Sequence, residues 1–318
     1  MTRALFKFLL FALICLSFFS CLKEKAVSVD FEVIQLPFDL SVNKIIAEND
    51  SVLWVTQGDK YGRGALLNSY NGGLSWNVIL DYDYEIRDIS IKNGRIYIFP
   101  TGNKVLWSDD RGISWQDITM PGWEFFSAGH VFNNEDIILA GGENFGKGIL
   151  HFISSTNFNA DTIQHELSDM VSLNDSTLIT VGYGVILKST DRGQNWLPDE
   201  ARGDFYRAVS FSDENNGFVV GDYGSIRKTS DAGRNWKKIK SGSTFLNSTN
   251  RFKDVHFKTS EEGSIAGSNG LLWYSKNSGK TWIPISNLPD LDFETVLTRN
   301  NKILAGARGG KIVLMDKP

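Results

Sequence analysis

Short apolar segments separated by glycine-rich turns recur along the chain from about residue 31 to its end. The clearest unit has such segments at Tyr206–Phe211, Gly217–Gly221, Ser225–Thr229 and Trp236–Ile239. Runs of this length, bounded by glycine, asparagine and aspartate, predict β-strands. Paired glycines such as Gly221 and Gly224 predict a hairpin between the second and third strands. They do not predict a phosphate-binding loop, because such a loop is followed by a helix and no helical pattern follows these glycines. Each unit therefore predicts a sheet of four short antiparallel strands.

An eight-residue motif, the Asp-box, lies between the third and fourth segments of most units. It starts with Ser or Thr, has Asp or Asn two residues later and Gly two residues after that, and ends in Trp. The five full copies end at Trp76, Trp115, Trp196, Trp236 and Trp282. The spacings are 39, 81, 40 and 46 residues, so one copy has decayed in the double gap, and residues 155–162 occupy its place without the Trp. A period near 40 residues indicates four-stranded propeller blades.

The residue types of the box point to a structural role. An Asp or Asn at the third position, such as Asp110, Asp191 or Asp231, hydrogen-bonds the backbone of its own turn. The following Gly tolerates a positive φ, and the Trp begins the next strand and packs against a neighbouring blade. We therefore assign the box to fold stability and not to catalysis.

The units predict a single all-β domain, a seven-bladed β-propeller, over residues 31–318. Six blades lie near 40–80, 84–119, 123–165, 166–199, 204–240 and 250–287. The tail supplies three more strands, and Phe31–Leu36 supplies the fourth, so pairing of the two chain ends closes the ring and removes free sheet edges. Six or eight blades stay open as alternatives because the third unit is degenerate.

The first twenty residues have the pattern of an export signal. A basic start (Arg3, Lys7) precedes an apolar run that ends at Ser20-Cys21, a small residue before a cysteine. This resembles the cleavage site of bacterial lipoproteins, with an ordinary signal peptide or an uncleaved anchor as the alternative. We predict a signal peptide at 1–20, a lipidated Cys21 with a tether at 21–30, and a lipid-anchored protein of the cell envelope, whether periplasmic or facing the surface.

Charge and residue spacing exclude several function classes. Removal of the signal takes away two of the 33 basic residues, which leaves 31 against 37 acidic residues and a net charge of −6. This balance, with no basic stripe, argues against nucleic acid. The four histidines lack metal-ligand spacing, and no cofactor motif occurs, so we predict neither a metal nor a cofactor.

The complete repeat resembles that of a known family. Val220–Trp236 reads Val-Gly-x-x-Gly-x-Ile-x-x-Thr-x-Asp-x-Gly-x-x-Trp, and Val181–Trp196 is nearly the same. This is similar to the repeats of the photosystem II assembly and stability factors. The resemblance covers essentially the whole mature chain, and it implies a seven-bladed propeller that binds partner proteins. The Asp-box also occurs in sialidases and other glycoside hydrolases.

The predicted innermost strands carry a charged or polar residue at a matching position. In successive blades we align Asn43, Arg87, Glu124, Asp169, Arg207, Lys253 and Glu294. Innermost strands line the channel of a propeller, so this alignment predicts a mixed-charge ring at the channel mouth. It is either a solvated start of the strands or a docking site in which Arg87, Arg207 and Lys253 bind carboxylates.

These observations favour a non-enzymatic propeller that binds an envelope protein. The alternative is a carbohydrate-active propeller that binds or cleaves glycans, with Trp123 as a stacking platform. The chain lacks the Arg-Ile-Pro string of sialidases, and no carboxylate pair is singled out by its position.

Overall fold

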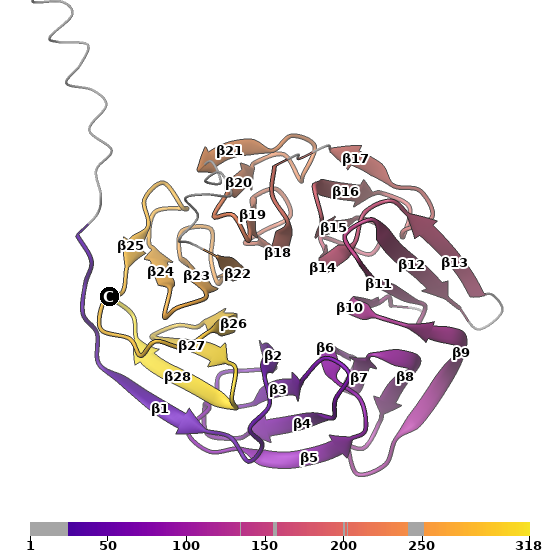
Figure 1. Cartoon of the computed structure of the whole chain (residues 1–318), viewed down its shortest axis with the longest axis horizontal. Coiled ribbons are helices and arrows are strands. Elements are labelled where there is room, and N and C mark those ends of the chain that lie inside the picture. The colour runs from indigo at the N-terminus through magenta and orange to yellow at the C-terminus, as the bar shows by residue number, and fades with distance from the viewer. Residues whose placement is uncertain (1–24, 134, 155–157, 200, 202, 241–250) are drawn as a thin grey trace, which may run out of the picture.

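Seven four-stranded antiparallel sheets form a ring (Figure 1). Residues from the innermost strands of all seven sheets line hollows on its axis, which together we call the channel. The computed structural model describes residues 25–318 except 134, 155–157, 200, 202 and 241–250. The predicted all-β class and the count of seven blades are confirmed. The signal residues, Cys21 and the core of the decayed third box at 155–157 lie outside the described residues.

Blades 1 to 6 each take their strands in chain order from the channel outward. Blades 1 to 3 contain β2 (Val42–Ala47), β3 (Leu53–Gly58), β4 (Gly64–Ser69), β5 (Asn77–Tyr82), β6 (Ile86–Lys92), β7 (Arg95–Pro100), β8 (Gly102–Ser108), β9 (Gln116–Glu124), β10 (Phe126–Val131), β11 (Ile137–Glu143), β12 (Lys147–Ile153) and β13 (Phe158–Ile163). Blades 4 to 6 contain β14 (Leu167–Ser172), β15 (Leu178–Gly182), β16 (Val185–Ser189), β17 (Leu197–Asp199), β18 (Tyr206–Phe211), β19 (Gly217–Gly221), β20 (Ile226–Thr229), β21 (Lys237–Lys240), β22 (Phe252–Phe257), β23 (Gly263–Gly267), β24 (Leu272–Ser275) and β25 (Ile283–Pro284).

Blade 7 joins the two ends of the described chain. Its inner strands are β26 (Phe293–Thr298), β27 (Lys302–Ala307) and β28 (Lys311–Asp316), and its outer strand is β1 (Phe31–Gln35). β1 pairs antiparallel with β28, as predicted from the lone N-terminal strand. Both chain ends thereby contribute to one sheet, which closes the ring (Figure 1).

The end of the predicted tether lies against blade 6. Val27 forms an isolated parallel bridge with Ile285, and the backbone N–H of Val29 donates to Asn287 Oδ1 at 3.1 Å. Val27 and Val29 also pack against the apolar core between blades 6 and 7. The chain therefore reaches β1 along the outer edge of the ring.

Burial falls from the second strand of a blade to the fourth. All five residues of β19 are buried, whereas β21, with the sequence Lys-Lys-Ile-Lys, is mostly exposed. A second strand packs against neighbouring blades through both faces, which explains its continuous apolar sequence. Within the described residues, no helix is long and apolar enough to cross a membrane.

The Asp-boxes turn the hairpins between third and fourth strands and fix the contact with the preceding blade. In blade 4, Ser189 Oγ accepts from the N–H of Gly193 at 2.8 Å, and Asp191 Oδ1 accepts from the N–H of Asn195 at 2.9 Å. Gly193 has φ +82°, and a Cβ there would lie 2.2 Å from Ile138 Cδ1 of blade 3. Glycine therefore avoids both the strain of the positive φ and a clash with the Ile138 side chain of the neighbouring blade.

The same local chemistry recurs in the other complete boxes. Hydrogen bonds donated by Ser114 lower the pKa of Asp110 to about 2, and those donated by Asn235 lower the pKa of Asp231 to about 2. Trp76 and Trp196 donate through Nε1 to the carbonyl of their own box Gly, at 2.9 and 3.0 Å. These carboxylates are used within their turns, as a structural role requires.

Candidate functional site at the channel mouth

Every inner strand contains a β-bulge at the same place. In β2, for example, the pairing with β3 shifts register between Val42 and Lys44, so Asn43 is the extra residue. A bulge re-aims a side chain and is common beside functional sites. The seven bulged residues are Asn43, Arg87, Ser127, Ser168, Arg207, Lys253 and Glu294. All seven line one hollow of about 280 Å³, here called the channel mouth.

The structure places five of the seven residues that the sequence aligned at the bulges, and a sixth, Asp169, lines the same hollow. Only Glu124, among the seven, does not line it. Glu124 lies at the end of β9, in the outer strand of blade 2, and the bulged residue of blade 3 is Ser127. Asp169 lies one residue after the bulge of blade 4, which is formed by Ser168. β9 is nine residues long and runs further than its unit predicted, which shifted the alignment in blade 3.

Three cations of the mouth, Arg87, Arg207 and Lys253, are held by carboxylates of the same chain. Arg87 Nε lies 3.2 Å from Glu85 Oε2, and Lys253 Nζ lies 3.3 Å from Asp222 Oδ1. Arg207 Nε donates to the other oxygen of Asp222 at 2.7 Å. Burial opposes the ionisation of Asp222, but Arg207 and Lys253 outweigh it and lower its pKa. Two cations therefore share one carboxylate, so this group of three side chains has one cation in excess, although Glu166, Asp169, Asp254 and Glu294 line the same hollow.

The remaining two predicted ring residues make internal contacts. Asn43 Nδ2 donates to the carbonyls of Gly58 at 3.2 Å and Ile86 at 3.1 Å, so it links blades 1 and 2. Glu294 Oε1 accepts from Arg308 Nε at 2.7 Å. Asn43 is thus engaged in holding the fold, whereas Arg87 and Arg207, about one third exposed, still face the hollow.

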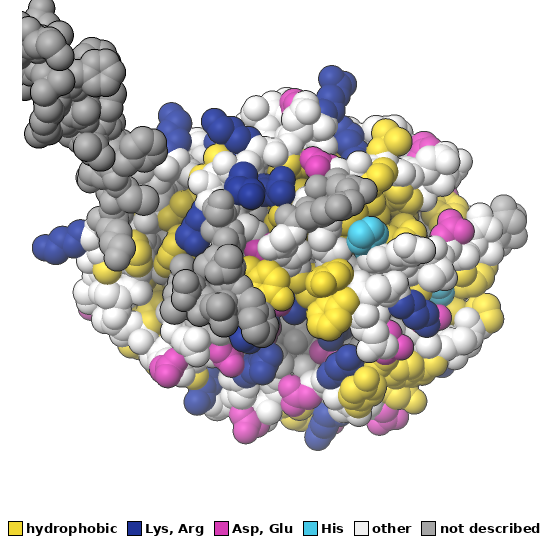
Figure 2. Space-filling view, turned by 45° about the horizontal axis from the view of Figure 1, so that its top comes forward, with side chains coloured by type: hydrophobic (Ala, Val, Ile, Leu, Met, Phe, Trp, Pro, Cys, Tyr) yellow, Lys and Arg dark blue, Asp and Glu magenta, His cyan; other side chains and the backbone are white. Residues whose placement is uncertain are grey.

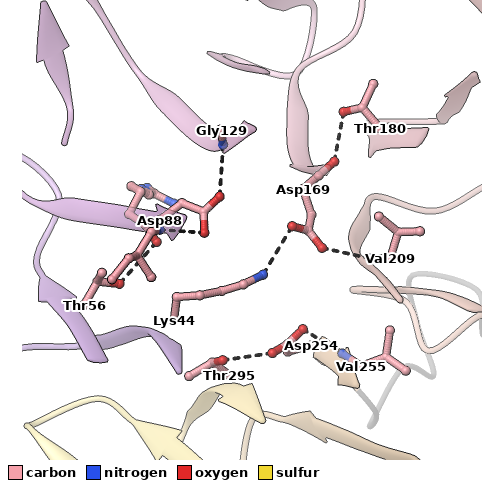
Figure 3. Close-up of polar contacts among 12 residues, drawn as sticks. Lys44, Thr56, Asp88, Gly129, Asp169, Thr180, Val209, Asp254, Val255 and Thr295 are labelled. Atoms are coloured by element: carbon pink, nitrogen blue, oxygen red, sulfur yellow. Dashed lines mark hydrogen bonds and ion pairs between the residues drawn. The ribbon is translucent and has the colours of Figure 1, made fainter. Parts of the chain in front are cut away.

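One layer below the ring, the channel contains four ionisable side chains (Figure 3). Lys44 projects from blade 1 toward Asp169, and its Nζ lies 3.4 Å from Asp169 Oδ1. Asp88 and Asp254 approach from blades 2 and 6 (Figure 3). The three aspartates are 7–8% exposed, and Lys44, at 30%, still contacts the channel. We call Lys44, Asp88, Asp169 and Asp254 the channel cluster.

The aspartates of the channel cluster join alternate pairs of blades. Each accepts a hydrogen bond from a backbone N–H on the inner strand of the next blade. These bonds run from Gly129 to Asp88 at 2.9 Å, from Val209 to Asp169 at 3.0 Å and from Val296 to Asp254 at 2.8 Å. Blades 2 and 3, 4 and 5, and 6 and 7 are linked in this way, so the cluster stabilises the ring from inside.

Burial and mutual charge set the pKa values in the channel cluster. Burial raises the pKa of Asp254 to about 6, against the effect of Lys44, and it raises the pKa of Asp88 in the same way. For Lys44, burial alone would lower the pKa, but Asp169, Asp88 and Asp254 outweigh it and raise the pKa. Lys44 therefore stays protonated and supplies the positive charge that the carboxylates need.

A second hollow of about 600 Å³ opens on the other side of the channel cluster. Lys44, Asp169 and Asp254 line both hollows, so the cluster separates them. His256 lines the second hollow, and its Nδ1 accepts from the backbone N–H of Thr298 at 3.2 Å. Burial lowers the pKa of His256 to about 4. In the part of the chain described, no group of three or more His, Cys, Asp or Glu is placed to hold a metal ion.

Sequence reasoning missed the channel cluster as a unit. The signal was present, because Asp88 and Asp254 directly follow the predicted ring residues Arg87 and Lys253, and a charge within an apolar strand is unusual. What the sequence could not supply was the convergence of Lys44 and Asp169, which are 125 residues apart.

Comparisons with known proteins agree with the repeat and the fold. Residues 202–297 match the family model described as "Photosynthesis system II assembly factor YCF48". The solved structure "YCF48 bound to D1 peptide" has a TM-score of 0.70 and 18% identity, and the match covers 94% of this chain and 99% of that one. YCF48 from Cyanidioschyzon merolae has a TM-score of 0.64 and 14% identity, with 91% and 98% covered. No curated protein matches the sequence.

The same architecture also carries enzymes. Virginiamycin B lyase from Staphylococcus aureus has a TM-score of 0.69 and 12% identity, with 91% of this chain and 100% of that chain covered. At such identities the likeness establishes the fold alone. The match over 202–297, together with the two YCF48 structures, confirms the resemblance to photosystem II assembly factors that the repeat indicated.

Proposed function

We propose that this assembly-factor-like propeller is a non-enzymatic, lipid-anchored protein of the cell envelope that binds a protein partner at its channel mouth. The observation that carries the proposal is the arrangement of Arg207 and Lys253 around one carboxylate, Asp222. The shared carboxylate fixes both cations while leaving a net positive charge for an incoming anion. Fixed donors bind more tightly than mobile ones because less side-chain entropy is lost.

Two further observations support the proposal. The matching family model is that of an assembly factor, and one of the similar structures is that of YCF48 bound to a D1 peptide. Arg87 and Glu294 face the same hollow as Arg207 and Lys253, so a charged segment of a partner would meet several fixed groups at once. The proposed lipid anchor rests on the sequence around Cys21. Several acyl chains hold a protein stably at a membrane.

The test is capture of crosslinked partners from native membranes. A chain with Arg87, Arg207 and Lys253 all changed to Glu should lose its specific partner, because three attractive contacts become repulsive. The matched control changes Arg234, Lys237 and Lys238 to Glu, three exposed cations at or near the outer strand of blade 5. It alters the net charge equally and should keep the partner. Both variants must retain the Tm of the parent.

The same cells report on the anchor. A labelled fatty acid should be incorporated into the full chain and not into its Cys21→Ser form.

If the mouth variant and the control keep the same partner equally, the mouth is not the binding site. If only glycans are captured, or if turnover of chromogenic glycosides appears, the carbohydrate-active alternative replaces this proposal.

A further inference from the structure

The face that carries the channel mouth also carries two aromatic clusters. The first consists of Tyr61, Trp123 and Phe125, with ring centroids 5.2 Å apart for Tyr61 and Phe125 and 4.5 Å apart for Trp123 and Phe125. Phe125 is buried, whereas Tyr61 is 71% and Trp123 44% exposed. A buried ring thus supports two exposed ones.

The second cluster, Phe145, Tyr183 and Phe205, is built in the same way. The Phe145 centroid lies 5.1 Å from that of Tyr183 and 5.9 Å from that of Phe205. Phe205 is buried, while Phe145 is 55% and Tyr183 42% exposed. Figure 2 shows hydrophobic side chains gathered beside the hollow at the centre of this face, with Lys and Arg side chains around it.

A cation of the mouth stacks on the buried ring of each cluster. Lys60 Nζ lies 4.7 Å from the ring centroid of Phe125, and the guanidinium carbon of Arg207 lies 3.8 Å from that of Phe205. Lys60, Phe125 and Arg207 all line the mouth. The aromatic clusters and the charged hollow therefore form one continuous surface.

Two of the residues with exposed rings have a backbone conformation that bulky residues avoid. Tyr61 has φ +64° and Phe145 has φ +62°, each in the hairpin between the second and third strands of its blade. The corresponding hairpins of blades 4 to 6 place a glycine in this conformation, at Gly184, Gly224 and Gly270. An aromatic residue at positive φ is strained, and a ring left in solvent gains little burial to offset the strain.

The strained turn of Phe145 is fixed by Glu166 at the rim of the mouth. The N–H of Phe145 donates to Glu166 Oε2 at 2.8 Å, and the N–H of Glu166 donates to the carbonyl of Phe145 at 2.9 Å. Glu166 also lines the mouth. Glu166 therefore holds the backbone that carries the Phe145 ring.

We propose that the two aromatic clusters bind apolar side chains of an extended peptide whose carboxylate enters the channel mouth. This inference rests on the proposed function and names the chemistry of the partner. The excess positive charge at Arg207 and Lys253 complements the carboxylate. Rings packed edge to face form corners that enclose aliphatic or aromatic side chains, and rigid aromatic anchors dominate the binding energy of such interfaces.

The test uses an array of random twelve-residue peptides, each printed with a free C-terminal carboxylate and as its amide. The full chain should bind peptides with apolar residues close to an acidic side chain or a free C-terminus. The two printed forms distinguish these two sources of the carboxylate. The variant Tyr61→Asn with Phe145→Asn should bind them about tenfold more weakly or worse. Its Tm should be unchanged or higher, because Asn tolerates positive φ.

The controls separate this inference from the proposed function. Ile113→Asn with Leu197→Asn removes two exposed apolar side chains that do not line the mouth and should leave binding intact. If the mouth variant with Arg87, Arg207 and Lys253 changed to Glu loses binding but the aromatic variant does not, the aromatic inference is wrong and the proposed function stands. A clear fall in the Tm of the aromatic variant, or binding to acidic glycans in place of peptides, would overturn the inference.

Discussion

Replacing Lys44 with methionine is expected to lower the free energy of unfolding by about 3 kcal/mol at pH 7. Asp88, Asp169 and Asp254 would then share the channel without a cation. Removal of one partner from a buried ionic cluster costs about 3–5 kcal/mol, and the 30% exposure of Lys44 places this case at the lower end. Urea unfolding of the two proteins at pH 7 measures the difference.

The deficit of the Lys44→Met variant should shrink at pH 5. Burial already raises the pKa of Asp254 to about 6 beside Lys44, so the folded state binds more protons than the unfolded chain between about pH 6 and pH 4. A carboxyl group whose pKa is higher in the folded state than in the unfolded chain makes folding more favourable as the pH falls. Loss of Lys44 removes a charge that lowers the pKa of Asp254, so the variant gains more stability on acidification than the parent does. Lys104→Met, which removes an exposed partner of Asp117, should change stability by less than about 0.5 kcal/mol at either pH. An equal deficit at both pH values would contradict the role given to the channel cluster.

Replacing Trp236 with alanine is expected to cost about 3–5 kcal/mol of stability. The indole is 7% exposed and packs edge to face on Phe211, with ring centroids 5.9 Å apart. It belongs to the core that joins blade 5 to Ile179 and Val181 of blade 4. The change therefore leaves a cavity between two blades, which thermal or urea unfolding would detect.

Trp123→Ala is the matched control for the Trp236 variant, because it also replaces an indole with a methyl group, but at a residue that is 44% exposed. It should cost about 1 kcal/mol or less, since surface substitutions seldom cost more. If the two variants lose similar stability, or if Trp236→Ala loses under about 1 kcal/mol, the Asp-box tryptophan does not anchor one blade to the next.

The fold was predictable because its information is local and repeated. The Trp spacing gives the blade period, and the strand that the tail lacks is supplied by Phe31–Gln35. In blade 5 the predicted first and second strands, Tyr206–Phe211 and Gly217–Gly221, coincide with those of the structure. Repetition lets weak local signals reinforce one another, which is rare in irregular folds.

The site was only partly predictable because it depends on details that repetition hides. A bulge adds one residue to a strand and interrupts the alternation of side chains between the two faces. The alternation of polar and apolar residues therefore does not reveal whether Ser168 or Asp169 occupies the bulge of blade 4. The aromatic clusters combine turn residues such as Tyr61 with residues between blades such as Phe125. Their proximity follows from closure of the ring and not from any spacing along the chain.

The most direct measurement is photo-crosslinking in native membranes with a photoreactive residue placed either at Tyr223 or at Leu197. Tyr223 lies in the hairpin next to Asp222 at the channel mouth, and Leu197 is 69% exposed on the outer strand of blade 4. We predict a crosslinked protein partner from position 223, lost when Arg87, Arg207 and Lys253 are changed to Glu, and none from position 197. A partner crosslinked only from position 197, or from position 223 regardless of the three charges, would contradict binding at the channel mouth.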